Sequence, residues 1–145
     1  MSMQALIQQI ESRIQATVPK ELLDAIRILD DTANEVDRLD EMGIVIRSAK
    51  ANRGIYFYEV LSVDSGKFPI TAGNGDLPSN WVSIADVNGG DALVYHVGTR
   101  AFYVYDHEAP PSMDPIRTVW QFAADVGELK QAVSIALDGL RAELT

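Results

Sequence analysis

The chain has 145 residues, of which 47% are hydrophobic and 23% are charged, values typical of a globular domain that buries its own core. It contains no cysteine, which excludes thiol chemistry and Cys-ligated zinc or iron–sulfur sites. Twelve basic and 21 acidic residues give a formal net charge of −9, and such a surface repels nucleic-acid phosphates and anionic lipids while attracting basic proteins.

The N-terminal sequence differs from a secretory signal peptide, because it has no basic n-region and its apolar residues are interrupted by Gln, Glu and Arg. No apolar run is long enough to span a bilayer. We therefore expect a cytoplasmic protein that binds neither membranes nor nucleic acid.

Two helices are predicted in the first part of the chain. Apolar residues recur at helical spacing over residues 3–16, and again from Pro19 to about Leu39. Pro19 ends the first helix and opens the second, since proline is tolerated in a first helical turn. Gly43 is expected to close the second helix in the left-handed conformation.

The pattern then changes to that of β-strands. Ile44–Arg47 and residues 55–61 are rich in β-branched and aromatic side chains. Residues 62–80 are rich in Gly, Asp, Asn and Ser, and predict a long loop.

Three further runs, over residues 81–87, 91–97 and 101–106, predict a three-stranded antiparallel meander. Asn88-Gly89 favours a type I′ turn between the first two, because both central residues of that turn need positive φ. Gly98-Thr99 indicates a type II′ turn between the second pair.

Residues 116–121 suggest a short edge strand. Asp125 and Glu128 then have the spacing of a helix N-cap, and apolar residues keep helical spacing to the C-terminus. The chain is therefore expected to be α+β, with a central, mainly antiparallel sheet packed by N-terminal and C-terminal helices. We expect residues 1–145 to form a single domain.

No motif predicts catalysis. The sequence has two histidines, His96 and His107, and the latter stands in Asp106-His107-Glu108, where alternate side chains diverge if the segment is extended. G-x-S-x-G and the Walker and Rossmann spacings are absent. We therefore expect a binding protein without a metal or other cofactor; an enzyme with an unrecognised site is the alternative.

Acidic residues are the candidate binding groups. Residues 24–41 contain seven acids and only two arginines, a pattern typical of a solvated helix face or, alternatively, of a docking face for a basic partner. Acids in loops and at strand ends also have two interpretations: they form the turns that Asp favours, or they bind a basic partner. The predicted partner-binding residues are Asp24, Asp31, Glu35, Asp76, Asp106 and Glu108.

Two segments carry a family resemblance. Residues 81–93 read as a hydrophobic strand that ends in an acidic, glycine-rich hairpin, and Val104-Tyr105-Asp106-His107-Glu108 as a strand that ends near an Asp-His-Glu sequence. Together they resemble the SUKH superfamily, which includes the yeast cell-wall-assembly regulator and many bacterial immunity proteins. Two features depart from its pattern: Val18 stands where leucine is usual, and an acidic stretch at residues 30–41 replaces an asparagine-glycine helix end.

The resemblance implies an α+β fold without catalytic residues. For many bacterial members it also implies binding and neutralisation of a cognate toxin, often a nuclease, whose basic groove an acidic protein can occupy. An intracellular regulatory or scaffold module with a non-toxin partner is the alternative that the eukaryotic relatives imply. An exposed strand edge would also permit a homodimer.

Overall fold

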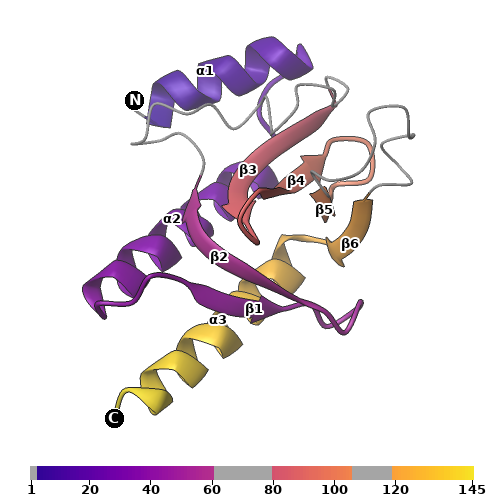
Figure 1. Ribbon diagram of the computed structural model, residues 1–145. Helices are drawn as coiled ribbons and strands as arrows, with labels where there is room; N and C mark the ends of the chain where they lie inside the picture. The colour runs from indigo at the N-terminus through magenta and orange to yellow at the C-terminus, as the bar shows by residue number, and fades with distance from the viewer. Residues whose placement is uncertain (1–2, 61–79, 106–118) are drawn as a thin grey trace.

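The structure, a computed structural model, describes residues 3–60, 80–105 and 119–145. In these residues the chain forms three helices and a six-stranded sheet, which confirms the predicted α+β class (Figure 1). In chain order the elements are α1 (Met3–Ile14), α2 (Lys20–Arg38), β1 (Ile44–Arg47), β2 (Gly54–Val60), β3 (Trp81–Val87), β4 (Asp91–His96), β5 (Ala101–Tyr105), β6 (Val119–Ala123) and α3 (Val126–Glu143).

The sheet is a continuous antiparallel meander in the order β1-β2-β3-β4-β5-β6. The predicted meander of β3, β4 and β5 is confirmed and is extended on both sides. β6 lies at one edge, as predicted, and β1 lies at the other. Among the described elements, no helix is long and apolar enough to cross a membrane.

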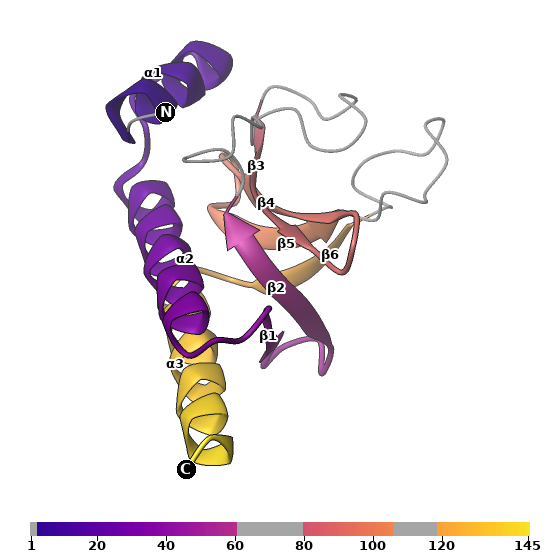
Figure 2. The ribbon, with the colours of Figure 1, turned by 60° about the vertical axis from the view of Figure 1, so that its left-hand side comes forward.

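The three helices lie on one side of the sheet (Figure 2). The larger core forms between them and the facing side of the sheet, from buried side chains of every helix and of all six strands. The opposite face of the sheet carries a second buried cluster, Trp81, Ala92, Val94 and Tyr105. Because both faces of β3 and β4 are buried, these strands have near-continuous apolar sequences instead of a strict alternation.

The two edges of the sheet approach each other at one end. Ser48, directly after β1, donates its hydroxyl to the carbonyl oxygen of Phe122 on β6 at 2.7 Å. The guanidinium of Arg53, before β2, lies 4.3 Å from the centre of the Trp120 ring on β6, a cation–π contact. The sheet is therefore strongly curved.

The C-terminal end of α2 differs from the prediction. The left-handed residue is Asp40, at φ 60°. Its N–H donates to Asp37 at 3.0 Å and the N–H of Glu41 donates to Val36 at 3.1 Å, which is the Schellman arrangement. The prediction for Gly43 is wrong, because aspartate is among the residues that tolerate this conformation and it ends the helix earlier.

One of the two predicted meander turns is confirmed. Asn88 and Gly89 both have positive φ, at 55° and 75°. The Asn88 side chain also accepts the N–H of Tyr56 at 2.8 Å, so the turn is held against β2.

The other turn is not of type II′. Four residues separate the paired His96 and Ala101, and the positive φ belongs to Arg100, at 59°. A side chain on Gly98 would lie 2.9 Å from the His96 ring. The glycine therefore makes room for this ring and does not provide a turn conformation.

The predicted N-cap of α3 is confirmed. The Asp125 carboxylate accepts the N–H of Glu128 at 2.8 Å. The Glu128 carboxylate reaches back to the N–H of Ala124 at 3.3 Å, one residue before the N-cap. Both ends of the motif thus satisfy backbone donors at the start of the helix.

Candidate protein-binding groove

The structure describes three of the six predicted partner-binding acids, all on α2. Asp24 and Asp31 line a shallow depression of about 450 Å³ between α2 and the start of α3. Arg27 and Lys130 line it too, and Lys20 lies 3.6 Å from Asp24. This surface therefore has mixed charge.

Glu35 has a structural role. Its side chain is only 14% exposed, it forms an ion pair with Arg38 on the same helix, and it lies 3.2 Å from the guanidinium of Arg141 on α3. Its negative charge is therefore balanced within the protein.

The other predicted acids, Asp76, Asp106 and Glu108, lie outside the described residues, as do His107 and most of the long loop predicted at 62–80. Their role stays a prediction.

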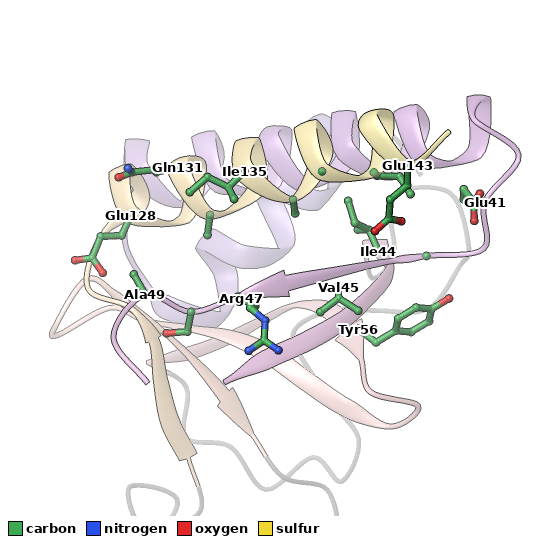
Figure 3. A pocket seen from close by; sticks show the side chains of 16 residues that line it. Glu41, Ile44, Val45, Arg47, Ala49, Tyr56, Glu128, Gln131, Ile135 and Glu143 are labelled. Carbon is green, nitrogen blue, oxygen red and sulfur yellow. The ribbon is translucent and has the colours of Figure 1, made fainter. Parts of the chain in front are cut away.

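A larger groove, of about 730 Å³, lies between α3 and the edge strand β1. Figure 3 shows β1 running along α3, with Val45 and Arg47 on the strand side and Ile135 on the helix side. Tyr56 of β2 lies at one end. Sequence reasoning did not predict this groove.

Exposed apolar side chains gather at this groove. Val45 is 55% exposed, Tyr56 42% and Ile135 65%, and Met42, at 87%, is two residues from the start of β1. Single exposed apolar residues are common on protein surfaces, whereas a cluster of them is typical of an interaction site.

Small residues shape the groove. Ala132, Ala136 and Gly139 follow one another along the side of α3 that lines it, because residues four and three apart share a helix face. At the end near Tyr56, a side chain on Gly43 would lie 2.6 Å from the tyrosine ring. Glycine at this position therefore allows the ring to lie against the chain.

The rim of the groove is acidic. Glu41 and Glu143 stand at one end and Glu128 at the other, with Arg47 between them (Figure 3). Arg47 is the one basic residue among the described residues that line the groove. The groove thus combines an apolar interior with a net negative border.

The backbone of β1 also faces the groove. Ser48 donates its N–H to the carbonyl of Arg53 at 2.7 Å. Since hydrogen-bonded and non-hydrogen-bonded pairs alternate in an antiparallel ladder, the two isoleucines of β1 bond to β2, while Val45 and Arg47 direct their N–H and C=O groups outward. In agreement, Tyr56, which is opposite Val45, makes its backbone bonds to Asn88 on its other side. Among the described strands, β1 pairs with β2 alone.

His96, the histidine within the described ranges, does not line the groove. The His96 ring lies between Trp81 and Tyr103, with centroid distances of 4.3 and 6.4 Å. Burial lowers the pKa of His96, and Thr99 donates its N–H to the Nδ1 atom at 3.0 Å, which requires an unprotonated nitrogen. In the described ranges, no three His, Asp or Glu side chains are grouped as metal ligands.

A buried tyrosine joins α2 to the meander. The Tyr95 hydroxyl donates to Glu21 on α2 at 2.9 Å, and Arg100 lies 3.5 Å from the same carboxylate. Burial, followed by this hydrogen bond, raises the pKa of Tyr95. We assign a structural role to this contact, because it holds α2 against β4.

No protein-family model, curated protein or solved structure matches the chain. The resemblance to the SUKH superfamily therefore stays a prediction from the sequence.

Proposed function

We propose that this protein binds a basic protein partner through the groove between α3 and β1, and that it acts as a stoichiometric inhibitor of a toxin. The observation that carries the proposal is the joint presence of exposed apolar side chains and an acidic rim in one groove. The resemblance to bacterial immunity proteins supplies the class of partner.

The two properties of the groove have different effects on binding. Burial of Val45, Tyr56 and Ile135 against a partner would provide affinity. The carboxylates of the rim, together with the net charge of −9, would attract a basic surface from a distance and accelerate association. A nuclease toxin presents such a surface where it binds phosphates. Rapid association matters for an inhibitor, because it must bind the toxin before the toxin acts.

The test is to co-express the chain with each toxin-like protein encoded beside its gene, and to isolate any complex. We expect rescue of growth and a complex with one copy of each protein. Failure to rescue with every such toxin would reject the inhibitor function. Capture of a basic partner without toxicity would instead favour the regulatory or scaffold alternative.

Charge reversal then tests whether the groove is the binding site. Glu41→Lys combined with Glu143→Lys should slow association about tenfold at low salt and weaken its salt dependence. The matched control reverses Asp24 and Asp31 on α2, where nearby bases already balance the charge, and should have a smaller effect. A larger effect of the Asp24 and Asp31 reversals would place the binding site on α2 instead.

A further inference from the structure

We infer that the partner inserts an extended segment into the groove, where it pairs with the outer edge of β1 as a seventh strand of the sheet. This inference rests on the proposed function, since it specifies how the same groove holds its basic partner.

The backbone of β1 provides the first argument. Val45 and Arg47 direct their N–H and C=O groups away from β2, and no hydrogen bond joins them to another described residue across that edge. An unpaired edge of this kind is a template for a further strand. Both residues are exposed and line the groove beside that edge.

The side chains define the segment. In an added strand, alternate residues would face α3 and would contact Ile135, Ala136 and Leu140, so they should be apolar. Glu128 and Glu143 lie about 22 Å apart along α3, roughly the length of seven extended residues. A segment of that length would place its ends beside the carboxylates of the rim, so we expect Lys or Arg near both ends.

Charge complementarity favours a partner over a second copy of this chain. Each copy carries a net charge of −9, and pairing of two β1 strands would bring the two acidic rims together. Like charges placed opposite each other in an interface oppose association. A basic segment from another protein meets the same groove with opposite charge.

The test uses a library of random twelve-residue peptides displayed on phage, selected against three forms of the full chain. Val45→Pro removes one outward N–H and leaves the bonds from β1 to β2 in place, because proline is compatible with an edge position whose N–H faces away from the sheet. Val45→Thr is the matched control: it keeps the N–H and the branched side chain. Urea unfolding of both variants verifies that they fold.

We expect the wild-type chain and Val45→Thr to select peptides with alternating apolar residues and basic ends, and Val45→Pro to bind them about tenfold more weakly. Equal affinity of the proline and threonine variants would overturn strand pairing. So would selection of no peptide, or of peptides without this pattern.

Amide exchange provides a second readout. In the free protein the amides of Val45 and Arg47 should exchange quickly and those of Ile44 and Ile46 slowly. The selected peptide should slow exchange at Val45 and Arg47 by at least about tenfold, whereas binding by side chains alone would not.

The two proposals fail in different ways. If a basic protein binds and the Glu41 and Glu143 reversals weaken it, but the two amides stay unprotected, the groove remains the binding site and strand pairing is rejected. If no basic protein binds, the proposed function itself is rejected. If sedimentation shows a dimer that Val45→Pro abolishes, the occupant is a second copy, which also overturns the inference.

Discussion

The hydroxyl of Ser48 donates to the carbonyl oxygen of Phe122 at 2.7 Å, and thereby joins the first and last strands of a six-stranded sheet. Ser48 is 4% exposed and also accepts the N–H of Ala51 at 3.1 Å. One buried side chain thus satisfies two backbone groups and holds the sheet in its curved form.

Replacing Ser48 by alanine should therefore destabilise the protein by about 1–3 kcal/mol, because it leaves buried polar groups unpaired. Urea unfolding measures the change. Ser83→Ala is the matched control: the Ser83 hydroxyl is also buried, but it has no hydrogen-bond partner among the described residues. Its removal should be neutral or stabilising, and equal losses for the two variants would contradict this assignment.

The ion pair between Glu35 and Arg141 should couple α2 to α3. Because the Arg141 side chain is 49% exposed, solvent screens the pair, and we expect a coupling energy of about 0.5–1 kcal/mol. A double-mutant cycle with Glu35→Gln and Arg141→Met measures it by chemical unfolding.

Asp138→Asn is the control for this cycle, since Asp138 is 78% exposed and lies 3.5 Å from Arg141. It should change stability by less than about 0.5 kcal/mol. Strict additivity of the Glu35 and Arg141 changes would show that the pair does not stabilise the helix contact.

Alanine should have opposite effects at two glycines that line the groove. At Gly43 the new carbon would lie 2.6 Å from the Tyr56 ring and 2.9 Å from the carbonyl oxygen of Phe57. The ring and the backbone carbonyl must therefore both shift, at a cost of about 1–3 kcal/mol. At Gly139, inside α3, no atom beyond the neighbouring residues and backbone of the helix itself lies within 4 Å of the new carbon. There, alanine should stabilise the protein by about 0.5–1 kcal/mol.

Thermal or urea unfolding compares the two glycine variants. A shift of the Tyr56 ring signals in the NMR spectrum should accompany Gly43→Ala and be absent in Gly139→Ala. A Gly43→Ala protein as stable as the wild type would show that the atoms around Gly43 can shift without cost.

Stability should depend on pH through His96. Burial lowers the folded-state pKa of His96 below its ordinary value of 6.5, so the unfolded chain takes up the proton first as pH falls. The stability that the neutral His96 side chain contributes is fully present above pH 6.5. It is lost as the pH decreases through the folded-state pKa. Urea unfolding between about pH 7.5 and 5 should show this loss.

His96→Gln should remove part of that pH dependence, because it deletes the titrating group while keeping a polar side chain. His107→Gln, at the other histidine of the chain, controls for the general effect of losing a histidine. Identical pH profiles for the wild type and His96→Gln would refute the assignment.

Local features of the fold follow from neighbouring residues. Pro19 lies at the start of α2, Asp125 caps α3, and the positive φ values of Asn88 and Gly89 follow from their chemistry. Helical and strand periodicity was enough for the α+β class, because each element buries one face or both. The two incorrect glycine predictions have different causes. Asp40 takes the left-handed conformation and ends α2 before Gly43 is reached, whereas Gly98 makes room for the ring of His96, two residues before it.

The helices and strands, the turn at Asn88-Gly89, the absence of cysteine chemistry and the net charge all follow from the order and chemistry of the residues. Three relationships became visible in the folded protein alone: β1 forms the second edge of the sheet, Glu35 pairs with Arg141, and Val45 and Ile135 line one groove. These relationships join residues far apart in the chain, and their geometry depends on how the sheet curves and where α3 lies against it. Periodicity within a segment reports which face of an element is buried, but it carries no information on which distant element covers that face.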